Sequence, residues 1–251
     1  PIFRQNAPMR TLEIACDTVT SALAAAEGGA DRIELVAALG EGGLTPSLGK
    51  FLTIKEQVSI PIFVMIRPRR ADFCYPDADF HEMLRDVALF REQGADGIVS
   101  GVLLPDGHVD VERTSKLREA AGELPFTFHR AFDMTPNVLE SMDSLIRVGV
   151  DRILTSGGKA SAPKGSSELR RLAFQAKDRI KIMAGAGIQR HNLPLLLNFP
   201  GLTEFHASAK GKAESAMTYR GTAAMGHDDS SEFSWYETQV ELVRELKECL
   251  S

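Results

Sequence analysis

Apolar residues along this chain fall into two alternating patterns, short continuous runs and longer stretches with helical spacing. The runs at residues 60–66, 124–128 and 180–184 are almost entirely apolar, which is typical of parallel strands covered on both faces. Residues 79–93 and 138–148 instead place apolar side chains three or four positions apart, as amphipathic helices do. The pattern therefore predicts strands that alternate with helices in an α/β domain.

A repeated phrase extends this alternation over the whole chain. Residues 29–35 read Gly-Ala-Asp-Arg-Ile-Glu-Leu, and related phrases occur at 94–100, at 149–155 and, more weakly, at 201–206. Each copy has the form of a helix-ending glycine, a short loop and a buried strand. Each interval between copies has room for two βα units of about 30 residues. With a first strand at residues 11–16 the strand count reaches eight.

We therefore predict an α/β fold, a (β/α)8 TIM barrel formed by residues 11–251 as a single domain. A doubly wound open sheet would also explain the alternation, but not a repeat that continues at even steps. Residues 1–10 have no apolar signal core and are expected to form an N-terminal arm. The polar stretch 211–234 is expected to be a long loop after strand eight, followed by a C-terminal helix over 235–250.

Composition narrows the class of protein. The net charge is -5 and the basic residues are spread along the chain, so no basic field indicates a nucleic-acid partner. No apolar stretch reaches the length of about 18 residues that a membrane helix needs. The three cysteines, Cys16, Cys74 and Cys249, lack metal-site spacing. This usage favours reduced thiols in a cytoplasmic protein.

Charged side chains occur within the first two predicted strands and directly after the third. Glu13 and Glu34 lie between apolar neighbours, and Arg67 follows the third strand directly. A buried carboxylate is costly unless it is paired, and Arg67 is the expected counter-ion. Two interpretations stay open: a Glu–Arg network that fixes the barrel geometry, or a site for a polar ligand at the strand C-termini.

Two histidines add candidate chemistry. His129 follows strand five and His206 lies near the end of strand eight. Each could be a proton shuttle, an anion donor or a metal ligand. The catalytic candidates are Glu13, Glu34, Arg67, His129 and His206, with His129 or a glutamate as general base.

Small residues end the last three strands, where many barrels bind a phosphate or carboxylate through backbone N–H groups. The anion-binding candidates are Thr155, Ser156, Gly157, Gly185, Gly187 and Ser208. The loops at residues 40–47 and 69–76 are long enough to act as lids over the barrel.

Several phrases together resemble the CutC family, which is named for a proposed role in copper homeostasis. They lie at residues 32–35, 41–47, 66–69, 72–75, 127–134, 154–157 and 183–187. The resemblance implies a TIM barrel, a cytoplasmic location, a homodimer or homotetramer, and copper binding. Members discussed as copper binders have cysteines at the positions that are Ala15 and Val36 here.

Cys16 is one position away from the first of these sites, so a strand would direct it to the opposite face. Cys16 and Cys74 are the remaining metal-ligand candidates, because Cu(I) prefers soft sulfur ligands. Three functions therefore remain open. The protein could bind copper, could bind or convert a small anionic, perhaps phosphorylated, metabolite, or could be a barrel whose strand-end ions are purely structural.

Overall fold

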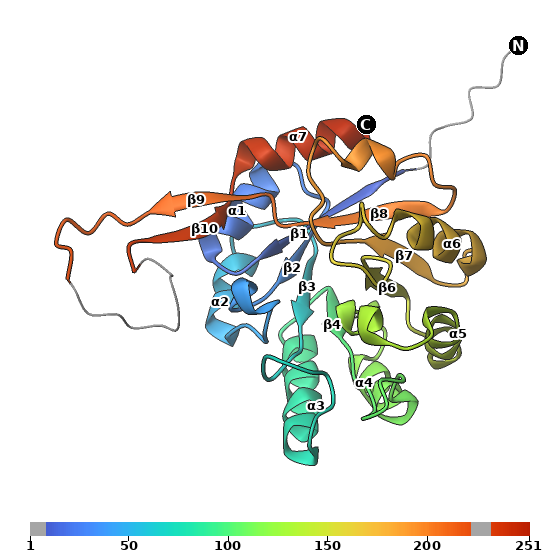
Figure 1. Cartoon of the computed structure of the whole chain (residues 1–251). Helices are drawn as coiled ribbons and strands as arrows, with labels where there is room; N and C mark the ends of the chain where they lie inside the picture. The colour runs from blue at the N-terminus through green and yellow to red at the C-terminus, as the bar shows by residue number, and fades with distance from the viewer. Residues whose placement is uncertain (1–8, 222–231) are drawn as a thin grey trace, which may run out of the picture.

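Eight parallel strands close into a barrel in chain order, which confirms the predicted fold (Figure 1). The computed structural model describes residues 9–221 and 232–251. The strands are β1 (Thr11–Cys16), β2 (Arg32–Leu35), β3 (Ile62–Met65), β4 (Gly97–Ser100), β5 (Phe126–Phe128), β6 (Arg152–Thr155), β7 (Lys181–Ala184) and β8 (Leu202–Ala207).

Helices surround the barrel and bury their apolar faces against the outer side chains of the strands (Figure 1). They are α1 (Val19–Glu27), α2 (Leu48–Lys55), α3 (Asp77–Glu92), α4 (Val111–Ala121), α5 (Val138–Val148), α6 (Ser166–Ala176) and α7 (Val240–Leu250). Short 3₁₀ turns are η1 (Leu39–Glu41), η2 (Arg130–Met134) and η3 (Leu193–Leu195). Within the described ranges, no helix is both long enough and apolar enough to cross a membrane.

The aspartates of the repeated phrase fasten neighbouring strands together. Asp31, Asp96 and Asp151 each accept a hydrogen bond from a backbone N–H at the start of the preceding strand, at 2.8 to 2.9 Å. Each carboxylate thereby satisfies a buried donor that the ladder alone leaves unpaired. The repeat therefore encodes a recurring strand-to-strand connection.

The position after these aspartates faces the interior of the barrel. It holds Arg32, Gly97 and Arg152 after the three aspartates, and Glu204 holds the same position after Thr203 in the fourth copy. A side chain at Gly97 would collide with the Phe63 ring, since a Cβ there would lie 2.6 Å from ring atoms. The glycine therefore makes room for an aromatic ring among the buried charges.

Beyond β8 the structure differs from the predicted loop and helix. Residues Lys210–Glu214 (β9) and Ser234–Thr238 (β10) form an antiparallel pair that projects from the barrel (Figure 1). The final helix begins at Val240, so the predicted start at Trp235 is wrong. β9 is mostly polar, and β10 has its two aromatic residues, Trp235 and Tyr236, next to each other on opposite faces. Neither strand shows hydrophobic alternation, which explains why the sequence did not reveal them.

The predicted N-terminal arm lies mostly outside the described part of the chain, which begins at Met9. Its last residue, Arg10, is fastened to the barrel because its guanidinium donates to the carbonyls of Leu197 and Leu250 at 3.2 and 3.4 Å.

Candidate functional site

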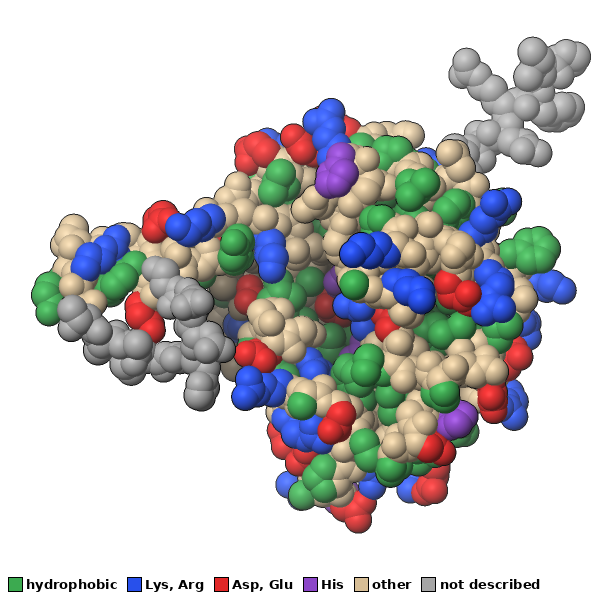
Figure 2. Space-filling view, in the orientation of Figure 1, with side chains coloured by type: hydrophobic (Ala, Val, Ile, Leu, Met, Phe, Trp, Pro, Cys, Tyr) green, Lys and Arg blue, Asp and Glu red, His purple; other side chains and the backbone are tan. Residues whose placement is uncertain are grey.

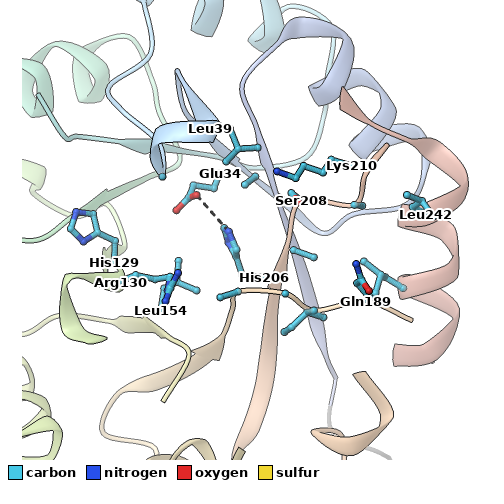
Figure 3. A pocket seen from close by; sticks show the side chains of 18 of the residues that line it. Glu34, Leu39, His129, Arg130, Leu154, Gln189, His206, Ser208, Lys210 and Leu242 are labelled. Carbon is cyan, nitrogen blue, oxygen red and sulfur yellow. Dashed lines mark ion pairs between the residues drawn. The ribbon is translucent and has the colours of Figure 1, made fainter. Parts of the chain in front are cut away.

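A cavity of about 1430 Å³ opens at the C-terminal ends of the strands. Figure 2 shows this face hollowed between the β9–β10 arm and the barrel, with charged and histidine side chains in and around the hollow. Glu34, Arg67, His129, His206 and Ser208 line it, and Figure 3 shows most of these side chains. Candidates from the ends of four different strands, β2, β3, β5 and β8, therefore meet in one space, as expected for the functional face of a barrel.

Below the cavity lies a set of ion pairs, which we call the ion network: Glu13, Arg32, Arg152 and Glu204. Arg32 bonds to Glu13 and also to Glu204, the latter at 2.9 Å. Arg152 binds Glu204 through two nitrogens. Both guanidinium groups lie over the Phe63 ring, at 4.7 and 5.4 Å from its centroid. Pairing and hydrogen bonding offset the large cost of burying these charges.

Arg67 does not belong to this network, so its predicted role as counter-ion to the glutamates is wrong. Strand register pairs Glu13 directly with Arg32, whereas Arg67 lies beyond the end of β3. Its terminal nitrogens donate instead to the carbonyls of Glu41, Gly43 and Ala71, at 2.9 to 3.0 Å. Arg67 thus fastens both of the loops that the sequence suggested as lids.

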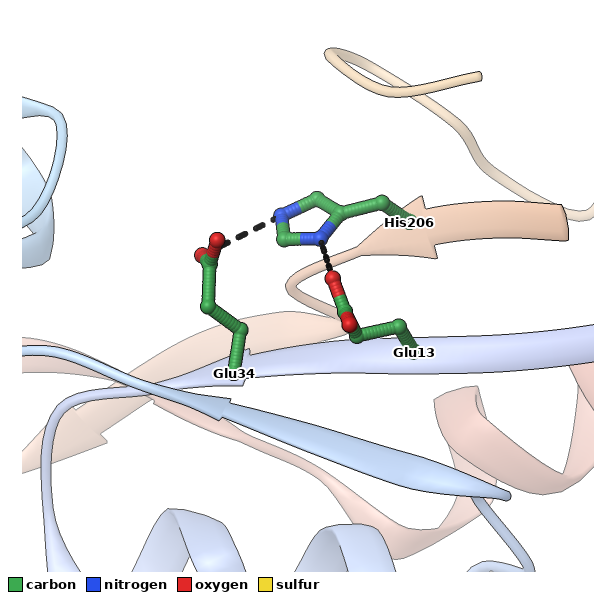
Figure 4. Close-up of side chains that lie close together, drawn as sticks. All are labelled: Glu13, Glu34 and His206. Atoms are coloured by element: carbon green, nitrogen blue, oxygen red, sulfur yellow. Dashed lines mark hydrogen bonds and ion pairs between the residues drawn. The ribbon is translucent and has the colours of Figure 1, made fainter. Parts of the chain in front are cut away.

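Glu13, His206 and Glu34 form a row across β1, β8 and β2 (Figure 4). His206 Nδ1 lies 2.7 Å from Glu13 Oε1, and its Nε2 lies 3.7 Å from Glu34 Oε2. An ionised carboxylate can only accept, so Nδ1 carries the proton and the ring is oriented by Glu13.

The environments of the two carboxylates push their pKa values apart. Burial alone would raise the pKa of Glu13, but Arg32 and His206 outweigh it and lower the value to about 2. Burial raises the pKa of Glu34 to about 7. Burial would lower the pKa of His206, yet Glu34 and Glu13 raise it overall. Such divergence is typical of groups assigned to different acid–base roles.

A charge count explains this divergence. The buried carboxylates of Glu13, Glu34 and Glu204 outnumber the guanidinium groups of Arg32 and Arg152 by one. A single proton shared between Glu34 and His206 therefore neutralises the group. The arrangement stores one proton at the edge of the cavity.

Three side chains on the cavity wall each keep a buried polar atom without a hydrogen-bond partner among the described residues. We call Glu34, Arg67 and His129 the open set; the atoms are Glu34 Oε1, Arg67 Nε and His129 Nε2. The residues are only 3, 5 and 3% exposed. Unpaired buried polar groups are rare and costly, and all three of these residues line the cavity.

His129 is a hydrogen-bond donor in this arrangement. Its Nδ1 accepts from the backbone N–H of Ala131 at 3.2 Å, so Nε2 carries the ring proton. Burial and the nearby Arg67 charge lower its pKa to about 3. The imidazole is therefore neutral at physiological pH, and the geometry favours Glu34 over His129 as a base.

The turn after β6 uses its anion-binding groups within the protein. Asp133 accepts hydrogen bonds from Thr155 Oγ1 at 2.5 Å, from the Ser156 N–H at 3.1 Å and from the Gly158 N–H at 2.9 Å. The Gly157 N–H donates to Thr155 Oγ1 at 2.9 Å. An internal carboxylate thus occupies the position where the sequence suggested an external anion.

The other anion-binding candidates differ in whether they line the cavity. Gly185 donates its N–H to the Thr155 carbonyl at 3.0 Å, within the barrel wall. Gly187 and Ser208 do line the cavity. Asp133, Arg32, Arg152 and Glu204 were not recognised from the sequence. Arg32, Arg152 and Glu204 occupy the same position of the repeated phrase, and this shared position could have identified them from the sequence.

The metal-ligand candidates lie apart from the cavity centre. Cys16 points to the outer layer with Ile14, and burial raises the pKa of its thiol. Cys74 lies in the loop after β3, where its carbonyl accepts a hydrogen bond from Arg69. Cys249, on α7, lines the cavity and is remote in sequence from both.

One group in the described chain has metal-ligand geometry: atoms of Glu13, Glu34 and His206 lie within 4.8 Å of one another. Oxygen and nitrogen donors suit harder divalent ions, whereas Cu(I) prefers thiolate or thioether. Glu13 is already bound by Arg32 and His206. The row therefore fits proton sharing better than a thiolate-type copper site.

A family model and two similar proteins identify the family of this chain. The CutC family model matches residues 10–211. The human copper homeostasis protein cutC homolog is 46% identical over 237 residues, which cover 94% of this chain and 87% of that protein. A family protein CutC from Chromobacterium violaceum is 43% identical over 242 residues, covering 96% and 98% of the two chains.

A solved structure shows the same fold. The putative copper homeostasis protein CutC from Streptococcus agalactiae superposes with a TM-score of 0.76 at 30% sequence identity, and the match covers 80% of this chain and 99% of that chain.

Proposed function

Given that the chain belongs to the CutC family, we propose that it acts in the cytoplasm on a small anionic metabolite. The ligand lies in the strand-end cavity, where Glu34 and His206 exchange a proton with it. The observation that carries this proposal is the row of Glu13, His206 and Glu34, in which Glu13 orients the His206 ring and both His206 and Glu34 line the cavity.

The Glu34–His206 pair supports the catalytic part of the proposal. Glu13 fixes the His206 ring through Nδ1 and leaves Nε2 directed toward Glu34 (Figure 4). The pair can remove a proton from one atom of the ligand and add a proton to another atom. The ligand then has the same composition as before, so the reaction is an isomerisation. A base with a pKa near the working pH serves this role best, and burial raises the pKa of Glu34 to about 7.

Copper binding is the second candidate, because the relatives carry names that refer to copper homeostasis. The donor set here does not fit a thiolate Cu(I) site. The positions expected to hold cysteine are Ala15 and Val36, and the Cys16 thiol is buried on the outer face of β1. Titration of reduced protein with Cu(I) should give an affinity that Cys16→Ser and Cys74→Ser leave unchanged.

A thermal-shift panel tests the proposal. Phosphate, sulfate, acetate and citrate are compared on the wild type, Glu34→Gln and His206→Asn, with His108→Asn as an exposed histidine control. Ligands that bind only the native state raise the melting temperature. We expect at least one anion to stabilise the wild type and the control but not the two cavity variants. Absence of any shift, or a shift that Glu34→Gln and His206→Asn leave intact, would contradict the proposal.

A further inference from the structure

The strand-end cavity is larger than a small anion requires. Pockets that enclose a drug-sized ligand measure about 300–1000 Å³, whereas this cavity measures about 1430 Å³. Figure 3 shows Leu242 and Gln189 on one side of His206 and His129 on the other. The cavity therefore extends from His206 toward α7, and we call this part the α7 compartment. Its apolar lining consists of Ile188, Pro194, Ala209, Leu242, Leu246 and Cys249.

The α7 compartment exists because the connection after β7 is short. Each strand from β1 to β6 is followed by an α-helix, but between β7 and β8 the described chain has only the turn η3, three residues long. This turn contacts α7 where a full helix would otherwise pack. The short connection leaves Pro194 of η3 and Leu242 of α7 on the wall of the cavity.

Helix α7 presents apolar side chains both to the core and to the cavity. Val243, Leu246 and Leu250 are buried against the barrel core. Leu242 and Cys249 are only half-buried, and both line the cavity. They lie about two helical turns apart, so they share one face of the helix. This face retains accessible apolar surface that an apolar group of a ligand can cover.

The loop after β7, which forms the opposite wall, is held in place by Asn192. The Asn192 amide donates to the Gly187 carbonyl at 2.9 Å and accepts from the Gln189 N–H at 3.0 Å. Arg190 of this loop pairs with Glu245 of α7 at 3.4 Å. The loop is therefore fixed before a ligand binds, and these two charges on the cavity wall are paired with one another.

We propose that the α7 compartment binds an apolar group of the ligand, so that the ligand is an anion carrying a ring or a short branched hydrocarbon chain. The inference rests on the proposed function and narrows its ligand class.

The position of the compartment connects it to the proposed reaction. It is part of the same cavity as the space in front of Glu34 and His206, so one molecule can fill both (Figure 3). The anionic part of the ligand lies at the strand ends, and its apolar part lies between α7 and the loop after β7. Burial of the apolar part then contributes affinity in proportion to the surface that it removes from water.

Matched pairs of ligands test the inference. Acetate is compared with phenylacetate, and phosphate with phenyl phosphate, by isothermal titration calorimetry on the wild type. The members of each pair share their anionic group and differ by a benzene ring. We expect the ring to tighten binding by about tenfold or more in at least one pair, as burial of an apolar group of this size should. The neutral 2-phenylethanol, which has the ring without the charge, should bind more weakly than phenylacetate.

Two leucine variants locate the ring. Leu242→Ser removes a half-buried apolar side chain of the compartment and should reduce the gain from the ring to about threefold or less. Leu89→Ser is the matched control, because Leu89 is a 37% exposed leucine of α3, away from the strand-end cavity. In this control the gain from the ring should match that of the wild type.

The Cys249 thiol gives a second measurement. In a Cys74→Ser protein the remaining cysteines are Cys249, which is half-buried, and Cys16, which is buried. Phenyl phosphate should slow the alkylation of Cys249 by N-ethylmaleimide, because the ring covers the thiol, and phosphate should slow it less. Equal protection by the two ligands would contradict a ring in the α7 compartment.

The outcomes distinguish the two proposals. If the ring tightens neither pair, or if its gain survives Leu242→Ser, the inference is wrong, while the proposed function stands as long as acetate or phosphate binding depends on Glu34 and His206. If 2-phenylethanol binds as tightly as phenylacetate, the compartment is independent of the anion and the inference is again wrong. Self-association in sedimentation that Leu242→Ser abolishes, without any gain from the ring, would assign the compartment to a second copy of the chain instead. If none of the four anions binds, both proposals fail.

Discussion

The ion network and the open set differ in one respect that decides their roles. Both consist of buried ionisable side chains inside the same barrel. In the network, Arg32 and Arg152 are paired with Glu13 and Glu204. In the open set, each of the three side chains retains an atom without a partner in the described chain. The buried charges of the network are therefore paired within the protein, whereas the open set leaves buried polar atoms unpaired.

Breaking the network should have the largest effect on stability. Arg152→Met removes two hydrogen bonds to Glu204 and leaves its carboxylate with Arg32 alone. Removal of one partner from a buried ion pair costs about 3–5 kcal/mol. Urea denaturation should show this decrease in the free energy of unfolding, while Arg70→Met at the surface should cost under about 1 kcal/mol. A similar small loss for both variants would mean that the network is not structural.

Removal of the Asp133 carboxylate should leave backbone N–H groups of the turn after β6 without a hydrogen-bond acceptor. Asp133→Ala leaves the N–H groups of Ser156 and Gly158 without their acceptor, at a cost of about 1–3 kcal/mol. Added sulfate should then restore part of the lost melting temperature, because the anion replaces the carboxylate. The wild type, in which Asp133 fills this position, should gain less from sulfate. Equal stabilisation of both proteins would contradict this account of the turn.

The pH dependence of stability should follow the open set. The pKa of Glu34 is raised from 4.5 to about 7 by burial, against the opposing charge of His206. The native state therefore holds a proton that the unfolded state releases, so stability falls as pH rises through this window. The raised pKa of His206, which faces Glu34, Glu13 and Arg32, acts in the same direction. Glu34→Gln should make the decline shallower in denaturation curves taken between about pH 5 and pH 8.

The Glu13 carboxylate gives a contrast within the same experiment. Burial alone would raise its pKa, but Arg32 and His206 lower it to about 2, so it stabilises the fold above its unfolded pKa of 4.5 and loses this effect only in acid. A wild-type profile that is flat from pH 5 to pH 8 would contradict the assignment of a shared proton to Glu34 and His206.

The sequence predicted the barrel because its repeat reports a local unit that recurs, and it placed Glu13, Glu34 and His206 near one another because parallel strands end on one face. It did not reveal which cation meets which carboxylate. That choice depends on strand register and on the space made by Gly97 for Phe63, both of which are tertiary properties. Asp133 was missed because a glycine-rich turn looks the same whether its anion comes from outside or from the chain itself.

The most direct test compares the same substitution in the two regions. Glu34→Gln and Glu204→Gln each replace a buried carboxylate by an isosteric amide. At a pH above about 7, where Glu34 is ionised, we expect Glu34→Gln to leave the free energy of unfolding unchanged or to raise it. Glu204→Gln should lower it by about 3–5 kcal/mol, since Arg152 loses its carboxylate partner and Arg32 keeps only Glu13. Equal destabilisation by both variants would contradict the division between a structural network and an open ligand site.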